Sequence, residues 1–187
     1  MSHEQTVELR GYLKARTAGR HDVLDALGAP ESFADRGAYC DFLARQFAAR
    51  LGLEHWVALY CPADLAPPPM AELLADDLAA NGCAFPHYPT RHFALPAGAD
   101  PLGLAWVVAG SHLGNRAMLA RLRREAPGTP AAFLADERMQ AFWKALRPRL
   151  EAQVSPAEAE GAALAAEAVF DHFLAAFAAH ASERIAA

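Results

Sequence analysis

Three glycines constrain this chain more than any other feature, because they lie inside a stretch that otherwise favours a helix. Gly103, Gly110 and Gly114 fall within residues 101–119, PLGLAWVVAGSHLGNRAML, at separations of seven and four residues. A regular helix places all three on one stripe. Each interior glycine destabilises a helix by roughly 1 kcal/mol relative to alanine, which is common elsewhere in this chain. Something must therefore approach this backbone closely, either another helix or a flat ligand.

The length and composition indicate one soluble globular domain. A chain of 187 residues buries about 70% of the surface that its unfolded form exposes. Although 53% of the residues are hydrophobic, no uninterrupted apolar run approaches the roughly 18 residues needed to cross a membrane. Residues 1–16 contain early acidic groups and no apolar segment, so we expect no secretory signal and a cytoplasmic protein. The net charge of −5 without a clustered basic face argues against nucleic acid as a partner.

The cysteines predict neither a zinc site nor a disulfide framework. Cys40, Cys61 and Cys83 are odd in number, and no two of them have the CxxC spacing. We therefore expect all three to be small buried hydrophobic residues.

Breaks in the sequence divide the chain into helical intervals with no predicted strand. Asp100 is a predicted N-cap, Ser155 and Glu158 form a predicted capping box, and Gly82 is a predicted C-cap. Pro148 is expected to kink or end the fifth helix. The prediction is a single all-α domain over residues 1–187, with residues 182–187 frayed and with helices at residues 5–27, 35–60, 70–81, 101–124, 133–146 and 155–180.

His21 is the histidine whose helix makes it a candidate ligand. No glutamate has a histidine three residues later, which argues against a di-iron bundle. Lys14 precedes His21 by two helical turns, or about 10 Å. A neutral imidazole that faces a cavity can bind iron, and a nearby lysine can meet a ligand carboxylate. A lone core histidine is more often structural, but the glycine-lined helix favours the ligand. The predicted inward stripe of the first helix is Leu9, Leu13, Thr17, His21 and Leu24.

Four segments resemble the heme oxygenase family, in the same order along the chain. Residues 13–27, LKARTAGRHDVLDAL, resemble the proximal helix of that family, in which a histidine four residues after a threonine binds the iron. Residues 106–115, WVVAGSHLGN, resemble the distal-helix motif of the bacterial, bacteriophytochrome-associated branch. Residues 73–82, LLADDLAANG, and residues 139–151, MQAFWKALRPRLE, are similar to two further segments of that branch.

The resemblance implies that heme lies in a slot between the first helix and the glycine helix, with His21 as the proximal iron ligand. The family cleaves heme with O₂ and external electrons to biliverdin, carbon monoxide and ferrous iron. Gly110 and Gly114 would let the distal backbone approach the heme, and Ser111 and Asn115 would hold the ordered water that delivers protons.

The resemblance also implies contacts around the heme and a set of partners. Lys14 and Lys144 match basic residues that contact the heme propionates, and Thr17 and Trp106 are expected in or beside the pocket. The expected electron donor is a ferredoxin or flavodoxin with its reductase, docking near the basic first helix (Arg10, Arg16 and Arg20). A bacteriophytochrome is a further expected partner, as the acceptor of biliverdin.

The chain departs from the branch at three positions, which keep other functions open. Ala109 replaces a glutamate, Asn115 replaces a glycine, and His112 stands where a small or apolar residue is usual. His112 as a second axial ligand would indicate a sensor or carrier, although a regular helix points it about 200° away from Gly110. The alternatives are therefore a non-catalytic heme- or bilin-binding protein of the same fold, and a helical domain that binds no tetrapyrrole.

Overall fold

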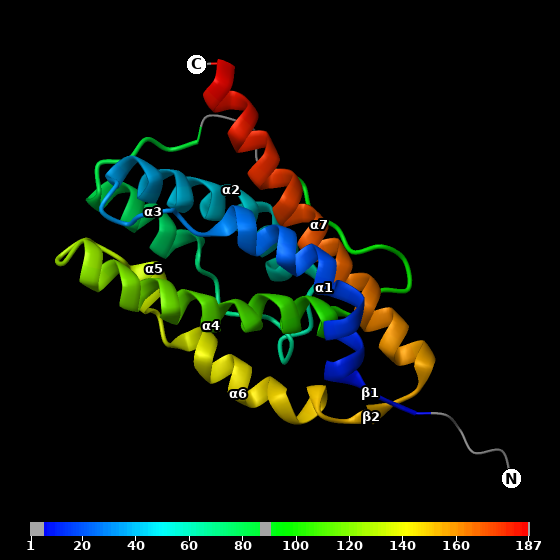
Figure 1. Cartoon of the computed structure of the whole chain (residues 1–187). Helices are drawn as coiled ribbons and strands as arrows, with labels where there is room; N and C mark the ends of the chain where they lie inside the picture. The colour runs from blue at the N-terminus through cyan, green and yellow to red at the C-terminus, as the bar shows by residue number, and fades with distance from the viewer. Residues whose placement is uncertain (1–5, 87–90, 187) are drawn as a thin grey trace, which may run out of the picture.

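Helices form most of the part of the chain that the structure describes. The computed structural model describes residues 6–86 and 91–186, with side chains up to residue 179. The predicted all-α class is confirmed (Figure 1). The predicted frayed tail, residues 182–187, lies beyond the described side chains, and residue 187 lies outside the described backbone. The helices are α1 (Leu9–Gly28), α2 (Arg36–Tyr60), α3 (Ala71–Ala80), α4 (Pro101–Glu125), α5 (Ala132–Ala135), α6 (Arg138–Leu150) and α7 (Pro156–Ala186).

The helix ends follow the local signals in the sequence. The Asp100 carboxylate accepts the backbone N–H of Leu102 at 2.8 Å and begins α4. Ser155 and Glu158 accept each other's backbone N–H groups, at 3.3 and 2.9 Å, and begin α7. Gly82 has a φ of +60° directly after α3, where an L-residue with a side chain would be strained. These predictions were correct because capping depends on residues close in sequence.

Two features of the secondary structure differ from the prediction. Strands β1 (Val7–Glu8) and β2 (Gln153–Val154) form a short antiparallel pair, although no strand was predicted. The predicted fifth helix is two helices, α5 and α6, because the Asp136 carboxylate accepts the backbone N–H of Arg138 at 2.9 Å and starts a new helix there. Pro148 lies inside α6, which ends at Leu150.

The cysteine prediction was wrong for two of the three residues. Cys40 on α2 and Cys83, just after α3, form a disulfide across 43 residues of sequence. Cys61 is a free, half-buried thiol. Because α2 and α3 pack side by side, the two cysteines meet in space, which spacing along the chain does not show.

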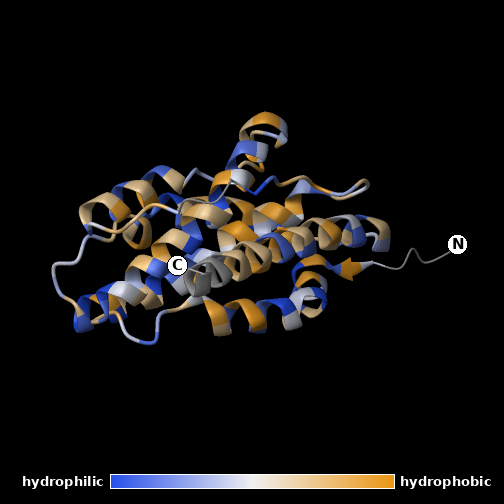
Figure 2. Ribbon diagram, turned by 90° about the horizontal axis from the view of Figure 1, so that it is seen from above, coloured by the Kyte–Doolittle hydropathy of each residue, from blue (hydrophilic) through white to orange (hydrophobic). Residues whose placement is uncertain are grey.

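Helix α7 is the centre of the fold. It packs most extensively against α1 and α4 and also contacts α2 (Figure 1). Apolar residues are frequent along the helices that cross the middle of the molecule (Figure 2). Residues 156–179 are long and apolar enough to cross a membrane by length and composition, but 56% of the tested window is buried inside the protein. The apolar character of α7 is therefore explained by its place in the core, which includes the fully buried alanines Ala159, Ala162, Ala163 and Ala166.

Candidate functional site

The three glycines of α4 have different surroundings. A Cβ atom on Gly103 would overlap the carbonyl oxygen of Ala162 on α7 and would lie 3.0 Å from the backbone nitrogen of Ala166. A Cβ atom on Gly110 would make only an ordinary contact, 3.9 Å from the Trp143 ring, and one on Gly114 would meet nothing within 4 Å. Helix packing therefore explains Gly103, whereas Gly110 and Gly114 leave α4 open on that stripe.

His21 lies on the solvent-exposed side of α1 and not in the core. Its side chain is 57% exposed, which corrects the prediction of an imidazole among core residues. Leu13 and Thr17 on the same stripe are buried. Within residues 6–86 and 91–186, α7 is the helix that packs extensively on α1, and the His21 ring contacts it at Phe170, with ring centroids 6.0 Å apart.

The two nitrogens of the His21 imidazole differ in their surroundings within the described part of the chain. Nδ1 lies 3.2 Å from the Asp25 carboxylate, one turn further along α1. Histidines that bind metals usually donate the second ring N–H to such a carboxylate or carbonyl, which fixes the tautomer and the orientation of the ring. Nε2 of His21 is therefore the atom available to a metal. Asp25 was visible in the sequence as the residue four after His21, but sequence reasoning did not select it.

The other predicted heme contacts on α1, α4 and α6 have ordinary surroundings. The buried hydroxyl of Thr17 donates to the carbonyl oxygen of Leu13 at 2.9 Å, so α1 itself satisfies it. Lys14 and Lys144 are exposed, and neither forms an ion pair with another described residue. Trp106 is half-buried and packs against the core.

Ser111 connects the open stretch of α4 to a buried cation. Its hydroxyl donates to the carbonyl oxygen of Val108 at 2.7 Å and accepts from Nη2 of Arg50 on α2 at 3.2 Å. Arg50 is only 2% exposed, and burial lowers the pKa of its guanidinium, an effect that the charge of Glu54 partly offsets. Nothing in the sequence marks Arg50, because it lies on an otherwise ordinary helix and meets Ser111 only in the fold.

His112 and Asn115 lie next to the α5–α6 region. His112 is 5% exposed, with Nδ1 placed 2.7 Å from the carbonyl oxygen of Ala109 and its ring 5.8 Å from that of Trp143. Asn115 and His112 line a cavity of about 230 Å³ together with Asp136 and other polar residues of the α5–α6 region. Ser111 and Asn115, predicted to share one polar stripe, therefore have different neighbours.

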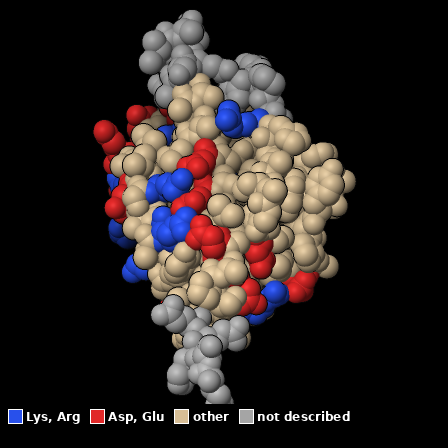
Figure 3. Space-filling model, turned by 90° about the vertical axis from the view of Figure 1, so that its right-hand side faces the viewer, with Lys and Arg blue, Asp and Glu red and all other residues tan. Residues whose placement is uncertain are grey.

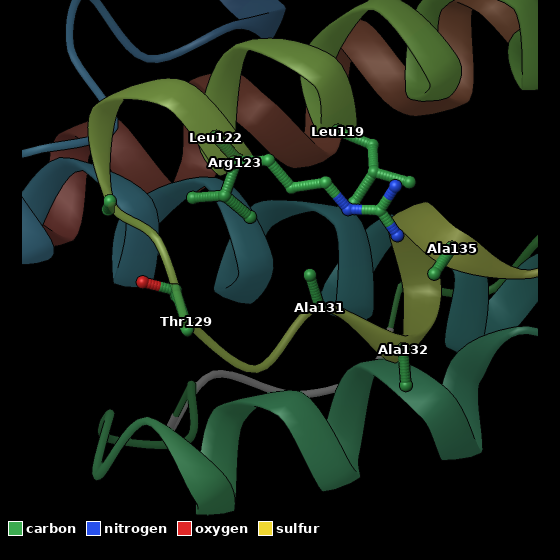
Figure 4. Close-up of a pocket in the computed structure, with 9 residues that line it drawn as sticks. Leu119, Leu122, Arg123, Thr129, Ala131, Ala132 and Ala135 are labelled. Atoms are coloured by element: carbon green, nitrogen blue, oxygen red, sulfur yellow. The ribbon is translucent and has the colours of Figure 1, made fainter.

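A second cavity, of about 260 Å³, lies at the C-terminal end of α4 (Figure 4). It is enclosed by that end of α4, by the turn that follows and by α5. None of the predicted site residues lines it, so it offers no support for a heme slot. Its labelled lining residues are Leu119, Leu122, Arg123, Thr129, Ala131, Ala132 and Ala135.

The arginines of α1 are largely neutralised by α7. Arg16 pairs with Glu160 and Glu167, and Arg20 pairs with Asp171 at 2.7 Å. The hydrogen bond with Glu160 is the largest of the effects that raise the pKa of Arg16. Figure 3 shows basic and acidic side chains next to one another, beside a broad area without charge. The basic surface expected on α1 for an electron donor is therefore largely paired with acidic residues of α7. Of the three arginines, Arg10 lies apart from these ion pairs, over the Trp143 ring.

Comparison with known proteins identifies the fold. No protein-family model matches the sequence. No curated protein matches it either. Among solved structures, the chain is similar to the heme oxygenase from Neisseria meningitidis whose NO- and CO-bound crystal structures address oxygen activation. The two are 22% identical, the match covers 93% of this chain and 92% of that chain, and the TM-score is 0.70. The chain therefore has the heme oxygenase fold, in a single domain.

Proposed function

We propose that this protein is a heme oxygenase of the bacterial, bacteriophytochrome-associated kind, which cleaves heme with O₂ and external electrons to biliverdin, carbon monoxide and ferrous iron. The observation that carries the proposal is that, on a heme oxygenase fold, one glycine of the stripe is needed for helix packing and the other two are not. Gly103 is required by helix packing, whereas Gly110 and Gly114 are not, so a different close neighbour is needed to explain them.

The residues present fit heme on both sides of the proposed slot. His21 offers an accessible imidazole whose Nδ1 lies 3.2 Å from the Asp25 carboxylate. Gly114 offers a backbone with no neighbouring side chain within 4 Å of an added Cβ atom, and at Gly110 such an atom would make only an ordinary contact with the Trp143 ring. Lys14 and Lys144 are exposed cations free to meet the two propionates of a heme. The three features correspond to the metal, the flat ring and the carboxylates of that ligand.

Each residue then has a defined part in the proposed reaction. When bound, heme supplies both the iron that activates oxygen and the ring that is oxidised. His21 binds the iron through Nε2, and Asp25 holds the imidazole in one orientation. Ser111 and Asn115 hold water from which protons are delivered, and Gly110 and Gly114 keep side chains out of the space that oxygen needs. Thr17 and Trp106 support the proximal and distal helices around the ring.

The alternative function is a protein of the same fold that binds heme or a bilin without turnover. The observation that favours it is Ala109, which stands where the related branch has a glutamate. Ala109 is fully buried, and it supplies no carboxylate there. His112 does not favour it, since the residue is only 5% exposed and its ring packs against that of Trp143.

One experiment separates these functions. Hemin is added to the purified protein, followed by O₂ with ferredoxin and its reductase or with ascorbate, while the Soret band is recorded. The proposal predicts loss of that band and growth of biliverdin absorbance. A Soret band that persists under these conditions supports the binding protein, and no Soret shift on adding hemin excludes both functions.

Two variants test the assignment of the ligand. His21→Ala is expected to abolish the normal axial ligation of the iron, because it removes the proposed Nε2 donor. The matched control is His112→Ala, which should leave the spectrum essentially unchanged. Unchanged spectra for His21→Ala would show that another residue binds the iron.

The proposed partners are a ferredoxin- or flavodoxin-type donor with its reductase, and a bacteriophytochrome that receives biliverdin. We also propose a cytoplasmic location, which the thiols can test. Disulfides are rare in the cytoplasm, so the bond between Cys40 and Cys83 is the feature that argues against it. Alkylation of thiols in whole cells before lysis decides the point, since protection of this pair would contradict the proposed location.

A further inference from the structure

Arg50 is a buried cation whose surroundings do not neutralise it. Its guanidinium lies between aromatic rings, 5.2 Å from the centre of Phe133 and 5.9 Å from that of Phe173. Nη2 donates to Ser111, but Nε and Nη1 are buried without a hydrogen-bond partner among the described residues. In the part of the chain that the structure describes, Nε and Nη1 of Arg50 are the buried side-chain nitrogen or oxygen atoms that lack a hydrogen-bond partner.

The nearest acidic residue along α2 is engaged elsewhere. The two carboxylate oxygens of Glu54 accept the backbone N–H groups of Met70 and Ala71, at 2.9 and 3.1 Å, where α3 begins. A cation taken out of water without a directly paired carboxylate is destabilising, and an apolar side chain of similar volume is usually better tolerated. Packing alone therefore does not account for an arginine at this position.

Ser111 fixes the position of Arg50 next to the open stripe of α4. The Ser111 proton is committed to the carbonyl oxygen of Val108, so one oxygen lone pair accepts from Arg50 and the other remains for a further donor. Ser111 directly follows Gly110, whose own side is open enough to accept a Cβ atom. The buried positive charge is therefore one hydrogen bond away from the backbone that we assign to the distal side of the heme.

We propose that Arg50 is a positioning residue whose buried charge makes the glycine side of the heme slot a site for small anions and acidifies water bound there. This inference rests on the proposed heme site. A fixed cation in a poorly hydrated pocket stabilises negative charge nearby without the reorganisation that water would need. Arg50 also orients the hydroxyl of Ser111, which sets where the next water molecule is held.

The test uses azide and pH as probes of the ferric, hemin-loaded protein, with the Soret and visible bands as readouts. Arg50→Met is expected to raise the Kd for azide by about tenfold or more, and to raise the pH of the water-to-hydroxide transition by about one unit. Arg50→Lys, which keeps the charge, is expected to retain azide affinity within about threefold of the unchanged protein. Arg50→Gln, which removes the charge but keeps hydrogen-bonding groups, is expected to weaken azide binding in the same direction as Arg50→Met.

The matched control is Arg45→Met. Arg45 lies on the same helix and also over an aromatic ring, that of Phe177 at 5.3 Å, but it donates to the carbonyl oxygen of Leu27. Arg45→Met should keep the Kd for azide within about twofold of that of the unchanged protein. It should also keep the transition pH within a few tenths of a unit, because the charge of Arg45 does not reach Ser111.

The outcomes separate this inference from the proposed function. No Soret band on adding hemin to the unchanged protein overturns both. A normal Soret band together with unchanged azide affinity and transition pH in Arg50→Met overturns the role of Arg50 alone. So does loss of hemin binding in a folded Arg50→Met variant, because that result would place Arg50 in heme binding itself. If Arg50→Met does not fold, Arg50→Gln decides, and unchanged azide affinity in that variant contradicts the inference.

Discussion

The N-terminal end and the middle of α4 use the same residue type for different purposes. At the N-terminal end, Gly103 lets the backbone of α4 contact the backbone of α7 at Ala162. At the middle of the helix, Gly110 faces the Trp143 ring at van der Waals distance and Gly114 faces open space. One stripe of glycines therefore combines a helix-packing contact at Gly103 with two positions at which packing does not require a glycine.

The difference shows which explanation of the glycines applies where. From the sequence, a neighbouring helix and a flat ligand were alternatives for the whole stripe. The structure supports the first for Gly103 and gives no packing reason for Gly110 and Gly114, for which we propose the ligand. Substitutions at Gly103 and at Gly114 should therefore separate effects on folding from effects on heme binding.

The largest expected effect is that of Gly103→Ala. The added Cβ would overlap the backbone of α7 near Ala162 and Ala166, and neither backbone can move aside as a flexible side chain would. We expect the free energy of unfolding to fall by about 3 kcal/mol or more, measured by denaturant unfolding. A loss below about 0.5 kcal/mol would show that α4 and α7 are not in backbone contact at this point.

Gly114→Leu should act on heme rather than on folding. Because nothing described lies within 4 Å of the added Cβ, the free protein should keep its stability, while the leucine side chain would enter the proposed slot. We expect the Kd for hemin to rise by about tenfold or more, measured by Soret titration. Ala120→Leu adds the same side chain at an exposed position of α4 off the glycine stripe, and should leave that Kd unchanged. Equal effects of the two variants would remove the case for a slot at Gly114.

Gly114→Ala should slightly stabilise the free protein. Alanine favours a helix over glycine, and no neighbour opposes the methyl group. We expect the free energy of unfolding to rise by about 0.5–1 kcal/mol, opposite in sign to Gly103→Ala. Thermal unfolding of the three proteins without hemin measures the contrast, and a marked loss of stability in Gly114→Ala would contradict it.

A smaller effect should follow from the histidine that joins α7 to α2. Nε2 of His172 lies 2.8 Å from the carbonyl oxygen of Ala49, and burial lowers the pKa of the imidazole below 6.5. The unfolded chain then binds a proton more readily than the folded chain, so the free energy of unfolding should decline as pH falls from about 6.5 toward the lowered pKa. His172→Gln should flatten this part of the profile. An unchanged pH profile in that variant would assign the acid sensitivity to other groups.

The sequence predicted the features that depend on near neighbours. The caps at Asp100 and Ser155 and the turn at Gly82 follow from residues within a few positions, and the all-α class follows from spacing. The disulfide between Cys40 and Cys83 did not follow, because it depends on how two helices pack.

The candidate site was predictable only in part, for the same reason. His21 and the glycines were found from their pattern and from the family resemblance. The exposure of His21 depends on which helices cover α1, and the contact of Arg50 with Ser111 joins residues 61 positions apart. Periodicity along one helix cannot show what another helix brings to it.

The central claim is that a heme lies between His21 and the open glycines of α4, and the crystal structure of the hemin-loaded protein tests it most directly. The account predicts iron bound to Nε2 of His21, with the opposite face of the ring against Gly110 and Gly114. Iron bound to His112, or a ring placed in one of the cavities beside α5, would contradict it.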